Sequence, residues 1–201
     1  MDKDWLFAAD EYICDLSVAI LCGGQSRRMG RDKARLAWNG QEMLDHIAGT
    51  LSALGEIFLS ADSGTHFEEK PWPVVVDQYP GCGPLGGVCS AMEACKTPLL
   101  FVVSCDMPFV TGQTGRLLQS RMEPGVDAAV PRDGSGRIHP LCAVYRRDAA
   151  PILRRQLQSG NLRMRDALEC LRTLYVQDLP GRVLCNVNTP EEYRKASQSE
   201  C

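Results

Sequence analysis

The sequence contains no cysteine pair with Cys-x-x-Cys spacing, although it has ten cysteines among its 201 residues. That spacing is typical of zinc sites and redox-active disulfides, so neither is predicted. Most of the cysteines instead stand in apolar runs, as Cys22 and Cys105 do. This is typical of buried thiols that act as small hydrophobic side chains. Cysteines that stay reduced indicate a reducing compartment, and we expect the protein to be cytoplasmic.

The chain also lacks a hydrophobic run of the ~20 residues that a membrane-spanning helix needs. Residues 1–15 are acidic and do not have the basic start and apolar centre of a signal peptide. We expect them to form an arm ahead of a single domain at residues 16–201. Lys and Arg total 22 against 25 Asp and Glu, for a formal net charge of −3. Such a chain is not expected to bind nucleic acid or anionic membranes.

Glycines and basic residues are concentrated directly after the first apolar run. Residues 17–21 read as a buried strand, Gly23 and Gly24 follow it, and five of the nine residues at 27–35 are basic. Adjacent glycines let the backbone approach a ligand without a Cβ in the way, and clustered positive charge suits a polyphosphate. We therefore predict a nucleotide site here. The alternative is a tight turn beside a solvated basic face.

This loop matches neither of the two common phosphate-binding motifs. A Walker A loop would have Gly-Lys where Met29 and Gly30 stand. The dinucleotide-binding fingerprint would have a glycine in place of Gln25. The loop therefore indicates some other class of nucleotide-binding protein.

Short apolar runs alternate along the chain with segments of helical periodicity. This alternation predicts a three-layer α/β/α, Rossmann-like domain with a mostly parallel, mixed central sheet. The part at 126–145 is expected to be more antiparallel. Strands are predicted at 18–21, 57–59, 74–76, 99–104, 128–130, 141–145 and 174–176. Helices are predicted at 43–54, 85–95, 114–122, 149–158 and 162–171, and from Pro190 onward.

Two acidic residues stand where predicted strands end. Asp77 follows the strand at 74–76, and Asp106 follows the strand at 99–104. In a parallel sheet both would lie at the carboxyl edge, where open α/β folds bind ligands. A carboxylate beside a polyphosphate needs a hard cation between them, and Mg²⁺ binds one or two carboxylates together with phosphate oxygens. The alternative is that either residue only caps a helix or a turn.

With these features together, the chain resembles the molybdenum cofactor guanylyltransferases, which are nucleotidyltransferases related to the nucleotide-diphospho-sugar transferases. The resembling segments occur in the family's order and span most of the chain. They are residues 21–33, 77–81, 83–87, 105–108, 139–140 and 186–192. Two positions depart from the family's pattern: Cys22 replaces its usual alanine, and Ser60 stands where it often has an asparagine with longer reach.

The resemblance implies transfer of GMP from GTP to molybdopterin, with Mg²⁺ as cofactor and release of pyrophosphate. It implies hand-over to molybdopterin-inserting proteins or target molybdoenzymes as the protein partners. Two alternatives remain open, namely a CTP-dependent cytidylyltransferase and a non-catalytic nucleotide-binding adaptor for molybdoenzyme maturation. The triplet Cys22-Gly23-Gly24 favours GTP, because CTP-dependent relatives tend to have Ala-Ala-Gly there.

The resemblance also implies roles for particular residues. The expected catalytic residues are Arg28, Lys33 and Asp106, and Asp106 is also the expected Mg²⁺ ligand. The expected nucleotide-binding residues are Leu21, Cys22, Gly23, Gly24, Lys33, Ser60, Asp77 and Asp106. The expected acceptor-side residues are Pro84, Leu85, Gly86, Asn186 and Asn188. For His139 we favour a structural role before Pro140 over a role as an acceptor-side ligand.

Overall fold

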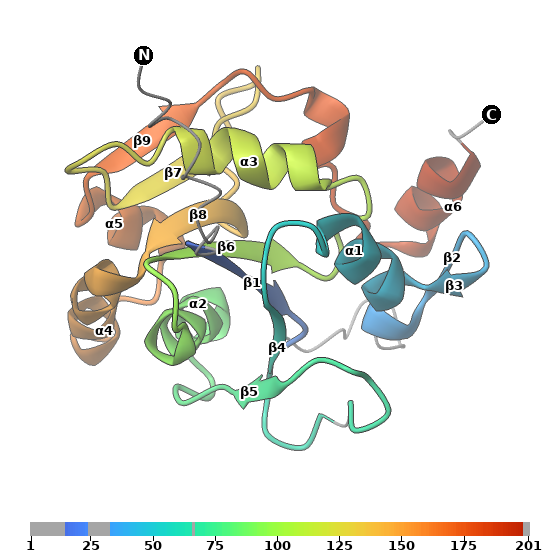
Figure 1. The fold of residues 1–201 in the computed structure, drawn as a ribbon, viewed down its shortest axis with the longest axis horizontal. Coiled ribbons are helices and arrows are strands. Elements are labelled where there is room, and N and C mark those ends of the chain that lie inside the picture. The colour runs from blue at the N-terminus through green and yellow to red at the C-terminus, as the bar shows by residue number, and fades with distance from the viewer. Residues whose placement is uncertain (1–14, 24–32, 66, 199–201) are drawn as a thin grey trace, which may run out of the picture.

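A seven-stranded sheet with helices on both faces forms the centre of the protein in a computed structural model that describes residues 15–23, 33–65 and 67–198 (Figure 1). The strand order is β5-β4-β1-β6-β8-β7-β9. The strands are β1 (Leu16–Leu21), β4 (Ile57–Ala61), β5 (Val74–Val76), β6 (Leu99–Ser104), β7 (Ala128–Pro131), β8 (Cys142–Arg146) and β9 (Thr173–Val176). Only β8 runs against its neighbours among these seven described strands. The predicted mostly parallel, mixed α/β/α sheet is confirmed, with its antiparallel part where it was expected.

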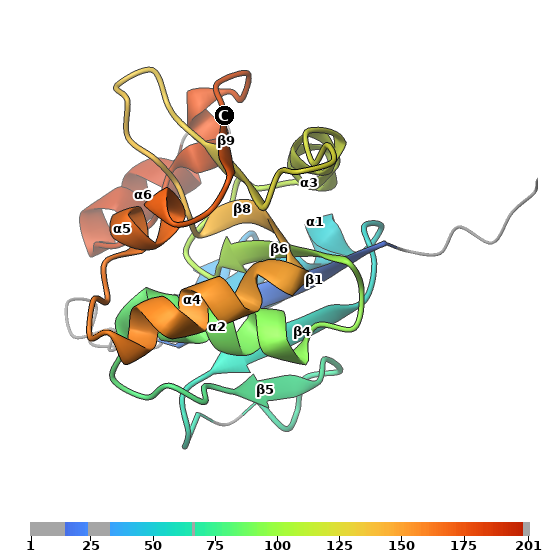
Figure 2. The same ribbon diagram turned by 90° about the vertical axis from the view of Figure 1, so that its left-hand side faces the viewer.

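The helices form layers on the two faces of the sheet. One face is covered by α1 (Met43–Leu51) and α3 (Gly112–Ser120), and the other by α2 (Gly83–Ala94), α4 (Ala150–Gln158) and α5 (Met164–Glu169) (Figures 1 and 2). The last helix, α6 (Pro190–Gln198), lies beside a small hairpin of β2 (Ala37–Trp38) and β3 (Gln41–Glu42). Single-turn helices occur at η1 (Lys33–Arg35), η2 (Arg147–Ala149) and η3 (Gly181–Leu184).

Alternating side chains of the central strands fill two separate cores. In β1, Val18 and Ile20 belong to the core under α1 and α3, whereas Ala19 and Leu21 belong to the core under α2 and α4. The strand β6 divides in the same way, and its residues 100–103 have no exposed surface. A strand that is covered on both faces reads as a continuous apolar run, which is why the sequence predicted these strands well.

The turn at Asn39-Gly40 closes a hairpin that the sequence analysis did not predict. Both residues have positive φ, 48° and 80°, as a two-residue hairpin turn of this kind requires. The strands β2 and β3 have only two residues each, so no alternating pattern could identify them. The helix α6 packs against this hairpin through the contact between Trp38 and Tyr193, so the hairpin helps to position α6.

The described cysteines are all free thiols. Five of them are buried, namely Cys22, Cys89, Cys95, Cys105 and Cys142, as expected of small hydrophobic side chains. Within the described ranges, no helix combines the length and the apolar character needed to cross a bilayer. The arm expected at 1–15 lies outside the described residues except for Asp15.

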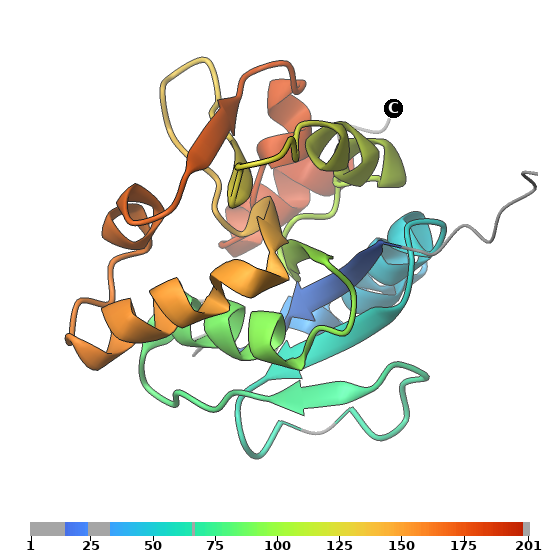
Figure 3. The same ribbon diagram turned by 60° about the vertical axis from the view of Figure 1, so that its left-hand side comes forward.

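The order of the strands creates a switch point beside β1. From β1 the chain moves outward to β4 and β5, and it then returns to β6 on the other side of β1 (Figure 3). At the carboxyl ends, the Cys22 amide donates to the Ser60 carbonyl (2.7 Å) and the Cys105 amide donates to the Leu21 carbonyl (3.1 Å). Ligands of open α/β sheets bind at such a switch point. Gly23, Ser60 and Asp106 therefore lie at one edge of the sheet.

Candidate active site

Three distant segments meet around the carboxylate of Asp106. The Lys33 ammonium donates to Asp106 Oδ2 (2.9 Å) and to Asn188 Oδ1 (2.7 Å). The Asn186 side-chain amide donates to Asp106 Oδ1 (2.9 Å), and the Val187 amide donates to the Asp106 carbonyl (2.8 Å). Asp106 is only 6% exposed. The structure thus brings together four residues that the sequence analysis had assigned to the site.

The position of Asp106 is fixed by the turn that follows β6. The Met107 amide donates to the Ser104 carbonyl (3.2 Å), and the Met107 side chain is buried in the core. On the far side of the turn, His46 Nε2 in α1 lies 2.9 Å from the Pro108 carbonyl oxygen. The Asp106 carboxylate therefore projects from a turn that is anchored both to the sheet and to α1.

The two asparagines are held by the start of α6. Glu192 Oε2 accepts hydrogen bonds from the backbone amides of Asn188 (2.7 Å) and Thr189 (3.0 Å). The Thr189 hydroxyl in turn accepts from the Glu192 amide (3.1 Å), which completes a capping box. Thr189 is therefore the N-cap of α6, which begins at Pro190 as predicted. The box also fixes the backbone of Asn188, because Glu192 reaches one residue beyond the cap.

The donor set around Asp106 fits a Mg²⁺ ion that is shared with a substrate. Each Asp106 oxygen accepts one hydrogen bond, and a carboxylate has about four acceptor positions, so room for a metal–oxygen bond remains. No described group of three or more His, Cys, Asp and Glu side chains could hold a metal ion. A single carboxylate is nevertheless sufficient when phosphate oxygens and water complete the shell, as is usual for Mg²⁺.

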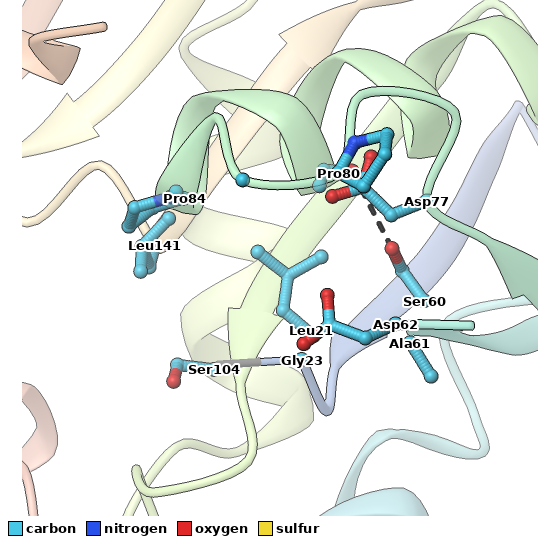
Figure 4. A pocket seen from close by; sticks show the side chains of 13 residues that line it. Leu21, Gly23, Ser60, Ala61, Asp62, Asp77, Pro80, Pro84, Ser104 and Leu141 are labelled. Atoms are coloured by element: carbon cyan, nitrogen blue, oxygen red, sulfur yellow. Dashed lines mark hydrogen bonds between the residues drawn. The ribbon is translucent and has the colours of Figure 1, made fainter. Parts of the chain in front are cut away.

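A first pocket of about 370 Å³ opens at the carboxyl ends of β1, β4 and β5 (Figure 4). It brings together four of the predicted nucleotide-binding residues. These are Leu21, Gly23, Ser60 and Asp77. Pro80 and Pro84 contribute apolar surface, so the pocket combines apolar walls with a few polar groups, as small-molecule sites do.

Asp77 is held rigidly at the edge of this pocket. Its Oδ1 atom accepts from the Tyr79 amide and from the Ser90 hydroxyl, both at 2.8 Å. The other oxygen lies beside Gly86, where a Cβ would stand 3.2 Å from Asp77 Oδ2 and 2.7 Å from the Tyr79 carbonyl. Position 86 therefore has to be glycine for the Asp77 loop to pack on α2.

A second pocket of about 550 Å³ lies beside the asparagines. Asn186 and Asn188 line it together with two arginines, Arg137 and Arg182. His139 also lines it, but this ring is only 7% exposed and its Nε2 lies 3.0 Å from Asp133 Oδ2.

Asp133 belongs to the same loop as His139. The hydrogen bond from the Ser135 hydroxyl, and to a smaller extent the one from His139, holds the pKa of the Asp133 carboxyl well below its ordinary range. Asp133 therefore stays charged and ties the loop at 133–139 together. This contact supports the structural role that we favoured for His139, although the ring also reaches the pocket.

The acceptor-side residues predicted from the sequence divide between different places. Asn186 and Asn188 line the second pocket, whereas Pro84 lines the first. Leu85 has no exposed surface, and Gly86 packs under Asp77. The expectation that Pro84, Leu85 and Gly86 share a side with the asparagines is therefore not matched by their positions, because the start of α2 faces the first pocket.

Three other predicted residues are Cys22, Gly24 and Arg28. The Cys22 side chain packs into the core, and its thiol donates to the Ile20 carbonyl (3.6 Å), so only its backbone is available to a nucleotide. Gly24 and Arg28 lie outside the described residues. No role in the site was predicted for Asp62, which lines the first pocket, or for Glu192, which holds the Asn188 backbone at the start of α6. The signal for Asp62 was its place two residues after Ser60.

The fold and the site define a nucleotidyltransferase. Residues 18–177 match the family described as the MobA-like NTP transferase domain. A relative from Pelotomaculum thermopropionicum, named "Probable molybdenum cofactor guanylyltransferase", is 34% identical over 185 residues, or 88% of this chain and 89% of the relative. A Mycobacterium tuberculosis protein of the same name is 35% identical over 181 residues, or 87% and 89% of the two chains. The chain belongs to the MobA-like NTP transferase family.

Solved structures agree with this fold. The molybdopterin-guanine dinucleotide biosynthesis protein A of Archaeoglobus fulgidus superposes with a TM-score of 0.80 at 24% identity, covering 92% of this chain and all of that one. The 2-C-methyl-D-erythritol 4-phosphate cytidylyltransferase of Thermus thermophilus gives 0.69 at 18% identity, covering 91% and 97%. At these identities the likeness supports the fold alone.

Proposed function

We propose that this enzyme transfers GMP from GTP to molybdopterin and releases pyrophosphate. The observation that carries this proposal is that Asp106 lies close to lining residues of both pockets. Ser104, two residues earlier, lines the first pocket, and Asn186, which donates to Asp106, lines the second. A nucleotide in the first pocket and an acceptor in the second would therefore meet near Asp106 and Lys33. The names of the curated relatives support the same pair of substrates.

The reaction needs positioning and charge neutralisation more than proton transfer. The attacking group is the phosphate monoester of the acceptor, which has a second pKa of about 6 and is largely dianionic at pH 7. It attacks the α-phosphorus of GTP in line, and pyrophosphate leaves. Lys33 stabilises the negative charge that accumulates in the transition state. A general base is not required, which agrees with the absence of any nucleophile–histidine motif in the sequence.

Mg²⁺ is the proposed cofactor, with Asp106 as its protein ligand. When bound, it supplies charge neutralisation at the phosphates. Asp106 would hold the ion through its carboxylate, which Lys33 and Asn186 keep oriented. Arg28 would add positive charge from the glycine loop. An Asp106→Ala variant with near-normal transfer at saturating Mg²⁺ would contradict the assignment.

The second pocket is the proposed acceptor site. Arg137 and Arg182 give it two guanidinium groups, which bind phosphates with paired hydrogen bonds. The Arg182 guanidinium is stacked over the Phe109 ring at 4.6 Å, so its plane is fixed at the pocket wall. A phosphate-bearing acceptor would be drawn to this wall, beside Asn188. In the cell we expect the product to pass, in the cytoplasm, to molybdopterin-inserting proteins or to molybdoenzymes.

The experiment that tests the function compares GTP with CTP in the presence of molybdopterin and Mg²⁺. We expect pyrophosphate release and a guanine dinucleotide product with GTP, and much slower release with CTP. Faster turnover of CTP would instead identify a cytidylyltransferase. Binding of GTP without any pyrophosphate release would indicate the non-catalytic adaptor, and Asp106→Ala supplies the inactive control.

A further inference from the structure

The first pocket has a charge that does not suit phosphate groups. Two carboxylates line it, Asp62 and Asp77, and its described lining contains no lysine, arginine or histidine. Both carboxylates point into the pocket, Asp62 beside Gly23 and Asp77 beneath Pro80 (Figure 4). Ionised carboxylates only accept hydrogen bonds. The pocket is therefore suited to a part of the ligand that is rich in hydrogen-bond donors, such as a nucleoside.

Asp62 extends the pocket-facing side of β4. Side chains alternate along a strand, so residues 60 and 62 share a side. Ala61 between them belongs to the opposite core, which agrees with this alternation. Ser60 is only 2% exposed and its hydroxyl donates to the Gly87 carbonyl (3.4 Å), whereas Asp62 is exposed to solvent. Of these two side chains, Asp62 is the one that a ligand can reach.

Asp62 also lies against the beginning of the glycine loop. A Cβ built on Gly23 would stand 3.1 Å from Asp62 Oδ1, so the carboxylate occupies the space that a side chain at position 23 would fill. Gly23 leads into the loop for which we propose phosphate contacts. Asp62 therefore lies where the first pocket meets the start of this loop, and in a nucleotide the ribose lies between the base and the phosphates.

The topology around Asp62 supports a ribose contact. The chain runs from β1 through a glycine loop and α1 to β4, which pairs in parallel beside β1 with Leu21 opposite Ser60. In dinucleotide-binding βαβ units, an acid about 20 residues beyond the glycine turn accepts a hydrogen bond from the ribose 2′-hydroxyl. Asp62 directly follows the second strand, β4, of a similar β-α-β order here, although it lies 39 residues beyond Gly23 and the glycine loop is of another kind.

We propose that Asp62 accepts a hydrogen bond from the ribose 2′-hydroxyl of the nucleotide and thereby selects ribonucleotides over 2′-deoxyribonucleotides. This inference rests on the proposed function only in taking a nucleotide as the ligand of the first pocket. It does not depend on which base is bound. Asp77 Oδ1 accepts hydrogen bonds from Tyr79 and Ser90, and we assign Asp77 to the part of the pocket that would hold the base.

The test measures binding by calorimetry, without turnover, for GTP and 2′-deoxy-GTP. The wild type should bind GTP roughly 10- to 100-fold more tightly than 2′-deoxy-GTP, as expected for a hydrogen bond to a charged acceptor. Asp62→Ala should weaken GTP binding by a similar factor and leave 2′-deoxy-GTP nearly unchanged, so that the ratio approaches one. Asp62→Asn, which keeps one carbonyl acceptor, should give an intermediate ratio. Ser63→Ala, in the same turn, is the matched control and should keep the wild-type ratio.

Several results would overturn the inference. These are a wild type that binds both nucleotides equally, an Asp62→Ala variant that keeps the ribose preference, and a variant that weakens both nucleotides alike. A wild type that does not bind guanine nucleotides would contradict the proposed function but would not by itself test Asp62. If the wild type binds CTP and not GTP, the same ratio is measured with CTP and 2′-deoxy-CTP, and Asp62 is still tested. Circular dichroism of each variant shows whether it has folded.

Discussion

Replacing Glu192 with alanine should slow nucleotidyl transfer by more than the loss of a helix cap explains. The Glu192 carboxylate accepts from two backbone amides, those of Asn188 and Thr189. Thr189→Ala removes the other half of the same capping box but leaves the contact between Glu192 and Asn188 in place. The two variants therefore separate the stability of α6 from the positioning of Asn188.

The expected magnitudes differ for stability and for rate. Loss of either half of the box should cost about 1 kcal/mol of stability, which corresponds to roughly 2–4 °C in Tm for a chain of this size. The hydrogen bond from Lys33 to Asn188 is charge-assisted and contributes about 1.5–3 kcal/mol. If release of the Asn188 backbone loses about 1.4 kcal/mol of it in the transition state, kcat falls roughly tenfold.

The assay combines thermal unfolding with steady-state kinetics of pyrophosphate release. Glu192→Ala should lower kcat about tenfold with a small change in the KM for GTP, and Thr189→Ala should lower the Tm similarly while keeping kcat within about twofold. Glu192→Gln should restore most of the rate, because a glutamine carbonyl can accept both amide hydrogens. Equal losses of kcat in the Glu192→Ala and Thr189→Ala variants would refute the positioning role.

Three further predictions concern the charged cluster, an ion pair and two glycines. Lys33→Ala should reduce kcat/KM by ~2–4 kcal/mol of transition-state stabilisation, and an unchanged rate would remove Lys33 from the site. The Arg172 side chain holds the pKa of the Asp127 carboxyl below its usual value, so this pair stabilises the fold above the unfolded pKa of about 4 and stops doing so as the pH falls through the folded pKa. Melting temperatures measured between pH 7 and 3 should accordingly fall more steeply for the wild type than for Asp127→Asn. In Gly115→Ala the added methyl group would stand 2.5 Å from a leucine carbon, so the free energy of unfolding should fall by about 1–3 kcal/mol. Gly49 lies on an open face of α1, so Gly49→Ala should raise the free energy of unfolding by up to about 1 kcal/mol. Chemical denaturation measures both changes.

Much of the fold could be predicted because the central strands are buried on both faces. Runs such as residues 99–104 are apolar without interruption, and helices of clear periodicity separate them. The ends of the elements were harder to predict. The helix expected from Thr114 begins at Gly112, because Thr111 caps it and Thr114 completes the box. The helix expected at 162–171 is only Met164–Glu169.

The meeting of Lys33 with Asp106 depends on contacts that no local pattern records. A parallel sheet predicts that Asp106 stands at the carboxyl edge, and the glycine loop must emerge nearby. The return of Asn188 to this edge depends on how α6 packs against the hairpin, where Tyr193 contacts Trp38 with the ring centroids 5.9 Å apart. Such packing between distant segments leaves no trace in residue spacing. Only the resemblance to a family pointed to the asparagines.

The division of the predicted acceptor side has a physical reason in the turn after β6. The chain reverses there, since the Met107 amide bonds back to the Ser104 carbonyl, so residues two positions apart serve different pockets. Ser104 faces the first pocket together with Pro84 at the start of α2, and Asp106 turns toward Asn186 at the second. Sequence order places residues 84–86 and 104–106 equally near the strand ends and cannot distinguish the two sides. A chain that serves both pockets with one short turn can place a single carboxylate close to residues of both, as the transfer that we propose would require.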